Sequence, residues 1–91
     1  MQTIIKGEKR HIGMKVTRRT GGSFTIDTAT FDVDGIQSGT CEIDQGTKEV
    51  YFLIDTTDQN FRKQRTYTAE FTVTIEGMDK VIKGHVPVMI R

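Results

Sequence analysis

The chain has 91 residues, of which 35% are hydrophobic and 27% are charged, and its formal net charge is +1. This length suits one domain, and the composition is that of a globular protein, which excludes a disordered chain and a pair of domains. The near-neutral charge gives no global attraction to nucleic acid or anionic lipid, and no apolar run approaches the roughly 18 residues of a membrane helix. We therefore expect a single domain over residues 1–91.

Cys41 is the only cysteine, so the chain cannot form an internal disulfide. A packed core must then stabilise the fold, as is usual where thiols stay reduced. The residues that follow Met1 lack the apolar stretch of a secretory signal. These features predict a protein that folds in the cytoplasm without a signal peptide.

Apolar and polar residues alternate along several short segments, which is the pattern of a half-buried β-strand. After a short opening strand over 3–5, the stretch 10–18 places three apolar residues on one face: Ile12, Met14 and Val16. Two glycines within 20–23 then predict a tight turn. The first quarter of the chain is thus expected to form two strands that end at this turn.

The stretch 24–33 changes phase near its middle. Phe24 and Ile26 share one face, whereas the apolar residues from Ala29 onward follow the opposite phase. Such a slip predicts a β-bulge, or a crossing from one short strand to the next. Asp34-Gly35 then provides a turn signal.

The middle of the chain predicts a hairpin. One strand carries Cys41 and Ile43 inward, residues 44–47 form the turn, and 49–55 form the return strand. The return strand is apolar on both faces, so we expect it to lie centrally. Because Cys41 alternates with Ile43, it is expected to be a small core residue rather than a reactive thiol.

Residues 56–66 are polar apart from Phe61, which predicts a crossover loop anchored by that ring, with room for one helical turn. The stretch 67–75 has the most regular alternation, and a glycine turn leads from it to a last strand. In that strand Gly84 predicts another bulge, and Pro87 predicts an edge position or an amide without a partner.

About seven strands at intervals of roughly 8 to 12 residues predict an all-β protein, an antiparallel immunoglobulin-like β-sandwich. An open barrel such as the OB-fold is the structural alternative. In an immunoglobulin-like domain, Tyr67 would form a tyrosine corner, a buried ring whose hydroxyl bonds to the backbone a few residues upstream. Otherwise Tyr67 is simply the first core residue of its strand.

The inward faces of the expected strands predict the core. Its members are Ile12, Met14, Val16, Phe31, Val33, Phe52, Ile54, Tyr67, Ala69, Phe71, Val73 and Val88. These residues recur at a period of two, so they would line one face of each strand.

Residue patterns typical of catalysis or cofactor binding do not stand out. His11 and His85 are expected on the surface, and one cysteine with two distant histidines cannot form a closed structural zinc site. The acidic turn 32–35 lacks the remaining ligands of a calcium loop. We expect no enzymatic activity and no cofactor or metal.

Charge is segregated along the chain. The net charge is +5 over residues 1–20, −7 over 21–60 and +3 over 61–91. Because the first and last strands of a sandwich often lie close together, the basic segments are expected to form one side. They predict an interaction surface on Lys9, Arg10, Lys15, Arg18, Arg19, Arg62, Lys63 and Arg65. The alternative is a set of solvated faces whose charges neutralise one another.

A resemblance to a known class of proteins rests on the order of several short motifs. They are Lys6-Gly7-Glu8, a Gly-Gly turn, Thr28-Ala29-Thr30-Phe31-Asp32-Val33, Asp44-Gln45-Gly46, Val50-Tyr51-Phe52-Leu53-Ile54 and Tyr67-Thr68-Ala69-Glu70-Phe71-Thr72-Val73. Together they resemble the small immunoglobulin-like modules of phage tail and baseplate proteins, above all the N-terminal domain of upper baseplate proteins. The resemblance implies a virion-associated structural module that assembles with copies of itself or with another tail component.

Two other functions are weighed against this one. A carbohydrate or cell-surface binding domain would prefer exposed aromatic residues, but the chain has no tryptophan and most of its aromatic residues are expected to face inward. An OB-like nucleic-acid binding domain needs aromatic residues among lysines and arginines, and only Phe61 lies in such a setting. A protein partner is therefore expected, rather than nucleic acid or a membrane.

Overall fold

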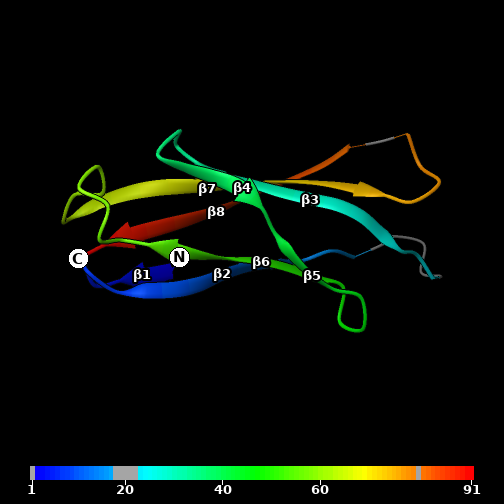
Figure 1. Ribbon diagram of the computed structural model, residues 1–91, viewed down its shortest axis with the longest axis horizontal. Coiled ribbons are helices and arrows are strands. Elements are labelled where there is room, and N and C mark those ends of the chain that lie inside the picture. Colours follow the sequence, from blue (N-terminus) through cyan, green and yellow to red (C-terminus); the bar gives the residue numbers. More distant parts are fainter. Residues whose placement is uncertain (1, 18–22, 80) are drawn as a thin grey trace.

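The computed structural model describes residues 2–17, 23–79 and 81–91. Within these ranges the chain forms strands and turns, without a helix (Figure 1). The eight strands are β1 (Gln2–Ile4), β2 (Lys9–Lys15), β3 (Ile26–Val33), β4 (Gln37–Thr40), β5 (Glu42–Asp44), β6 (Glu49–Asp55), β7 (Arg65–Ile75) and β8 (Val81–Ile90). Most of the turn predicted over 20–23, together with Arg18 and Arg19 of the predicted interaction surface, lies outside the described residues.

The strands form two sheets that pack face to face. The five-stranded sheet has the order β1-β8-β7-β3-β4, and the three-stranded sheet has the order β2-β6-β5. The all-β prediction is confirmed, although the count of about seven strands was too low. The fold is also not wholly antiparallel, because β1 pairs in parallel with β8. Two sheets with separate edges do not form the five-stranded barrel of an OB-fold.

The additional strand arises where the chain passes from one sheet to the other. The polar segment Gln37–Thr40 pairs with β3 in the five-stranded sheet, and Glu42–Asp44 pairs with β6 in the three-stranded sheet. Cys41 lies between them, and its N–H donates to the carbonyl of Ala29 (2.8 Å). The predicted hairpin is confirmed, with β6 at the centre of its sheet.

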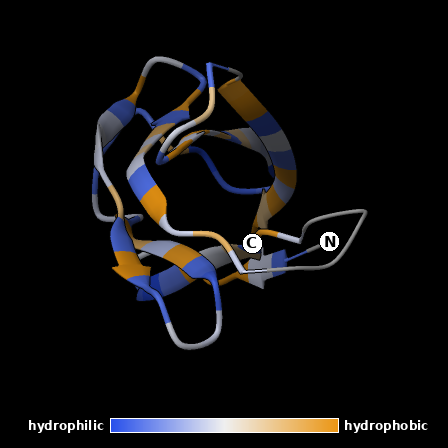
Figure 2. Ribbon diagram, turned by 90° about the vertical axis from the view of Figure 1, so that its right-hand side faces the viewer, coloured by the Kyte–Doolittle hydropathy of each residue, from blue (hydrophilic) through white to orange (hydrophobic). Residues whose placement is uncertain are grey.

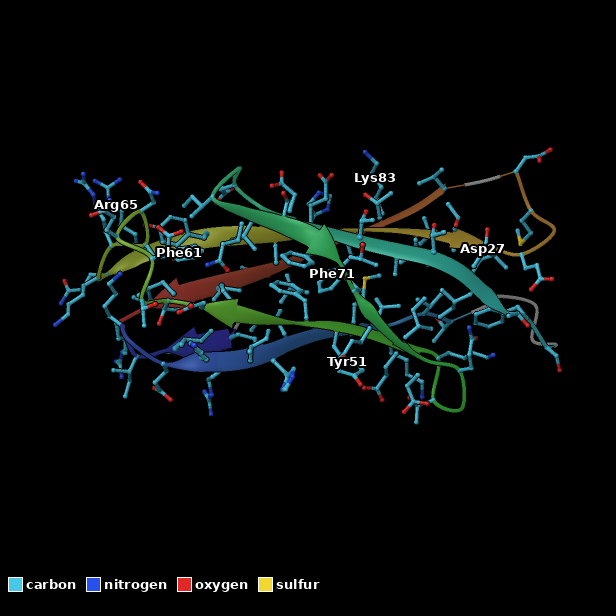
Figure 3. The ribbon with its side chains drawn as sticks, in the orientation of Figure 1. Asp27, Tyr51, Phe61, Arg65, Phe71 and Lys83 are labelled. Atoms are coloured by element: carbon cyan, nitrogen blue, oxygen red, sulfur yellow. The ribbon has the colours of Figure 1, made fainter. Side chains whose placement is uncertain are left out.

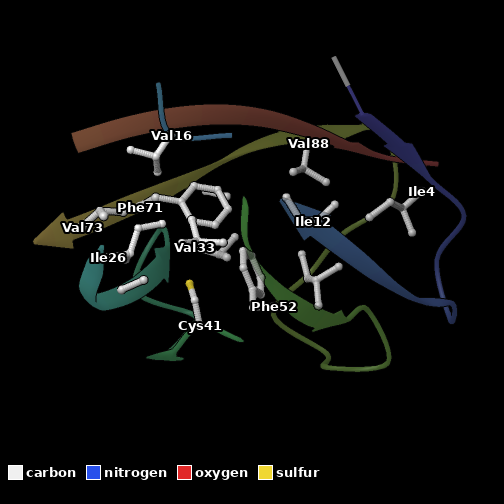
Figure 4. Close-up of a cluster of buried hydrophobic side chains, with 14 of the residues drawn as sticks. Ile4, Ile12, Val16, Ile26, Val33, Cys41, Phe52, Phe71, Val73 and Val88 are labelled. Carbon is white, nitrogen blue, oxygen red and sulfur yellow. The ribbon is translucent and has the colours of Figure 1, made fainter. Parts of the chain in front are cut away.

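A single core fills the space between the sheets (Figure 4). Its centre is aromatic, because Phe31 of β3 stacks on Phe52 of β6 with 3.8 Å between ring centroids, and Phe52 also contacts Phe71. The predicted core residues are buried, except that Met14, Phe31 and Tyr67 are only partly so. Along the strands, hydrophobic and hydrophilic residues alternate as the period of two requires (Figure 2).

Two irregularities predicted within strands have different outcomes. The bulge near Asp27 is confirmed, because the register of β3 against β7 shifts between Ile26 and Thr28. The bulge predicted at Gly84 is wrong, because β8 pairs with β7 without interruption. Gly84 instead leaves room for Met14 of the opposite sheet, whose Sδ lies 2.0 Å from where a Cβ would stand.

The crossover between β6 and β7 is held by its side chains rather than by a helical turn. Phe61 anchors it as predicted and is only 1% exposed. The hydroxyl of Tyr67 donates to the carbonyl of Asn60 (3.3 Å) and accepts the N–H of Arg62 (2.8 Å). The upstream hydrogen bond predicted for Tyr67 is therefore present, although the ring is only half-buried and packs edge-on against Phe61.

Thr56, the first residue after β6, joins this crossover to the β1–β2 turn. It is fully buried, its hydroxyl donates to the carbonyl of Glu8 (2.6 Å), and it accepts the N–H of Gly7 (2.9 Å). Buried hydroxyls are found where such partners exist. The crossover and the β1–β2 turn thus form one end of the molecule, which also contains the C-terminal residue of β8 through the Gln64 N–H to Ile90 carbonyl bond (2.6 Å).

Candidate interaction surfaces

The fold brings most of the predicted basic residues to this same end. Arg62 and Lys63 lie in the crossover, and Lys9 and Arg10 begin β2. Arg65, which is labelled in Figure 3, begins β7. We call these five residues the basic end. Lys15 lies apart from them, because it closes β2 opposite Glu49, at the far end of the strand.

Charges at the basic end are exposed and weakly paired. Lys9 lies 3.9 Å from the carboxylate of Asp55, with side-chain exposures of 58% and 39%, so this ion pair contributes little to stability. The pKa of Asp55 is lowered chiefly by hydrogen bonds from the hydroxyl and N–H of Thr57, and further by the positive charge of Lys9 and Lys6. Arg10 donates to the carbonyl of Thr3 (3.2 Å).

The two long sides of the molecule differ in charge. On one side β2 lies near β1 and β8, as shown by the Arg10 bond to Thr3 and the approach of Met14 to Gly84. On the other side β5 lies near β3, where the Gln45 side chain bonds to the backbone of Ile26. The first side carries Lys9, Arg10, Lys15, Lys83 and Arg91 against Glu8, and the second carries Asp27, Asp32, Asp34, Glu42 and Asp44 against Lys48. The segregation in sequence is therefore retained in the fold.

The outward face of the three-stranded sheet holds an apolar patch that the sequence did not predict. Tyr51 and Leu53 occupy this face of β6, and Figure 3 shows Tyr51 pointing away from the interior. Leu53 is 49% exposed, and the ring of His11 contacts Tyr51 edge-on at 5.6 Å. Gly13 lies opposite Tyr51, where a Cβ would approach the Tyr51 Cβ to 3.2 Å. The sequence of β6 is apolar on both faces, which was the only signal for this patch, but that pattern favoured burial of both faces.

Charged residues flank this patch in separate columns. On the outward face β2 presents Lys9, His11 and Lys15, whereas β5 presents Glu42 and Asp44. Outward residues that are paired across neighbouring strands form the rows Lys15–Glu49–Asp44, Gly13–Tyr51–Glu42, His11–Leu53 and Lys9–Asp55. We call these outward residues of β2, β6 and β5 the three-strand face.

The outward face of the five-stranded sheet is polar and rich in threonine. Thr28 bonds to Thr74 across strands β3 and β7. Glu70 lies 3.0 Å from the ring of His85 and 3.7 Å from the amine of Lys83. His85 is exposed, as is His11, which confirms the expectation for both histidines.

Cys41 is buried in the core, as predicted. Burial raises the pKa of its thiol from 9.0 to about 11, which disfavours the reactive thiolate. Among residues 2–17, 23–79 and 81–91, histidine, cysteine and carboxylate side chains do not gather in groups of three that could hold a metal ion. The same residues include no helix with the length and apolar character needed to cross a membrane.

Comparisons of the chain with protein-family models, with curated protein sequences and with solved structures found no match. Function must therefore be inferred from the arrangement of strands and from the two charged sides, the basic end and the three-strand face.

Proposed function

We propose that this chain is a non-enzymatic immunoglobulin-like module of a phage or prophage tail, where it joins proteins of the virion. The strand order supports the immunoglobulin-like assignment: β8-β7-β3 corresponds to strands G-F-C, and β2-β6-β5 corresponds to B-E-D. Tyr67 supports it as well, because its hydroxyl returns to the backbone just before the strand that corresponds to F. The phage assignment rests on the resemblance of the sequence motifs.

The observation that carries the assembly function is the separation of charge between the two long sides. A basic side around β2 and an acidic side around β3 and β5 can meet in a head-to-tail contact between copies, or each can bind a different partner. Repetition of a head-to-tail contact produces rings or tubes, which are the forms of a tail. The basic end would add Arg62 and Lys63 to such a contact with an acidic protein.

The test is the protein content of purified particles. Tagged chain should be recovered from gradient-purified virions at a fixed copy number, and its association should weaken with added salt. The variant Arg62→Glu/Lys63→Glu should lower incorporation, whereas the matched Arg62→Lys/Lys63→Arg control, which keeps both charges, should not. Absence of the chain from particles would refute the tail assignment, and incorporation that ignores the charge reversal would refute the role of the basic end.

Carbohydrate binding remains a second candidate because Tyr51 faces outward beside Gly13. If this function holds, Tyr51→Ala abolishes binding in a glycan screen while the wild type binds. Nucleic-acid binding has less support, because Phe61, the aromatic residue among Arg62, Lys63 and Arg65, is buried and has no free face for a base.

A further inference from the structure

The two outer strands of the three-strand face carry opposite charges. Its β2 column is basic, with Lys9 and Lys15 as its charged residues, and its β5 column is acidic, with Glu42 and Asp44. Between the columns, β6 presents the apolar side chains of Tyr51 and Leu53, with Glu49 and Asp55 at the two ends of the strand. A face of this kind is complementary to itself after one particular rotation.

That rotation is a half-turn about a two-fold axis that runs parallel to β6 and lies in the plane of the contact. It turns a second copy over so that β6 faces β6, and each β2 column faces the β5 column of the other copy. Because the axis keeps positions along the strands unchanged, Lys15 comes opposite Asp44 of the second copy and close to its Glu42, and Leu53 meets Leu53. Glu49 and Asp55 also meet their own copies, and the neighbouring Lys15 and Lys9 of both copies offset this repulsion. We propose that the three-strand face is the contact of an isologous homodimer with this geometry.

Three features of the free face agree with a second copy as the occupant. Lys15, Glu42 and Glu49 form no ion pair within the described part of the chain, so their charges remain available. Gly13 has no side chain, so β2 presents only its backbone to a facing copy beside Tyr51. Leu53 is half exposed at the centre of the sheet, where burial by a partner gives the largest gain.

The size of the face determines the expected affinity. The strands β2 and β6 have seven residues each and β5 has three, which gives roughly 280 Å² of flat contact per copy. The total for two copies, roughly 560 Å², lies below the roughly 1,200 Å² of a standard stable interface. The dimer should therefore be weak, with dissociation in the micromolar to millimolar range, and it would gain strength where many copies are held together.

The inference rests on the proposed assembly function and names one of its partners, but its core contact, Leu53, lies outside the basic end. The two ideas therefore separate experimentally. A face-to-face dimer is closed, so it does not repeat by itself into rings or tubes.

Sedimentation velocity over a concentration series, at low and high salt, measures the dimer. The wild type should dimerise with increasing concentration, and Leu53→Glu should remove the dimer. Val81→Glu is the matched control, because Val81 is a similarly exposed strand residue (54% against 49%) on the other sheet, and it should leave dimerisation unchanged.

Charge exchange tests the orientation. Lys15→Glu and Glu42→Lys should each weaken dimerisation about tenfold, because each reversal acts at two symmetric contacts. The double variant should recover part of this loss, because the exchanged charges at positions 15 and 42 attract each other while position 15 still faces Asp44 of the second copy. Asp44 is left unchanged because it accepts hydrogen bonds from the N–H groups of Gly46 and Thr47 in its turn.

A wild type that stays monomeric at millimolar concentration and low salt refutes the dimer, as does a Leu53→Glu variant that associates like the wild type. A double charge variant without recovery refutes the two-fold geometry. If Arg62→Glu/Lys63→Glu removes self-association while Leu53→Glu does not, the basic end is the contact and only this inference fails. If the dimer is found but particles lack the chain, only the tail assignment fails.

Discussion

The fit of Met14 against Gly84 can be tested by adding a single methyl group. Met14 crosses from β2 to the other sheet, and a Cβ at position 84 would stand 2.0 Å from its Sδ and 3.1 Å from its Cε. The Met14 side chain must then move by roughly 1 Å or more, and forced repacking of this kind costs about 1 to 3 kcal/mol. Part of the cost is recovered, because alanine loses less backbone entropy than glycine, by roughly 0.5 to 1 kcal/mol. Gly84→Ala should therefore destabilise the fold by about 1 kcal/mol.

A double-mutant cycle isolates the contact. Met14→Ala should cost about 1 to 2 kcal/mol, less than truncation of a fully buried methionine, since Met14 is only partly buried. With Met14 shortened, the methyl group added by Gly84→Ala occupies vacant space, so the double variant should be more stable than the sum of the single changes by about 1 kcal/mol or more. Urea unfolding of the four proteins at equal slope measures this coupling. Additive single effects, within about 0.5 kcal/mol, would show that Gly84 is not kept small by Met14.

Three further predictions concern buried or bonded polar groups. Thr56→Val should cost about 1 to 3 kcal/mol in urea unfolding, because the N–H of Gly7 loses its acceptor; an unchanged midpoint would contradict this. Tyr67→Phe should cost about 1 kcal/mol, since the N–H of Arg62 is partly accessible to water once the hydroxyl is gone, and a midpoint equal to that of the wild type would refute the bond. The pKa of Cys41 is raised from 9.0 to about 11, so the unfolded thiol ionises first and stability should fall between these pH values. Cys41→Ala should lose this part of the pH dependence in parallel melts, and identical profiles would contradict the burial effect.

Alternation predicted the strands well where one face is apolar and the other polar. The strands β2, β6 and β7 agree with the stretches 10–18, 49–55 and 67–75 to within a few residues. The period of two carries this information directly, since a buried face selects every second side chain. The sequence of a strand does not show which other strand it pairs with. The parallel pairing of β1 with β8 was therefore not predicted.

The passage between sheets was missed for a related reason. Gln37–Thr40 has no apolar side chain, so nothing in its sequence separates a strand from a loop, and it is the pairing with β3 that makes it β4. Likewise, Gly84 has the same local pattern whether it forms a bulge or faces a methionine from the other sheet. These features depend on contacts between residues that are far apart in the chain.

The candidate surfaces were predictable in sign but not in position. The net charge of each segment can be counted from the sequence. Because β1 pairs with β8, the basic first and last segments lie on the same side of the fold. The separation of Lys15 from the basic end depends on the length and direction of β2. The exposure of Leu53 depends on the three-stranded sheet having one covered face, which the sequence of β6 alone does not specify.

The parallel pairing of β1 with β8 gives the domain a mechanical property. β1 follows the start of the chain and β8 precedes its end, so tension that separates the two ends slides these strands along each other. In this shear geometry, the load is shared by several hydrogen bonds at once, among them Arg91 N–H to Ile4 carbonyl and Lys6 N–H to Arg91 carbonyl, both 2.8 Å. A hairpin pulled from its open end would instead break its bonds one after another. A domain held in series by its two ends would therefore resist extension at its terminal strands before the core is exposed.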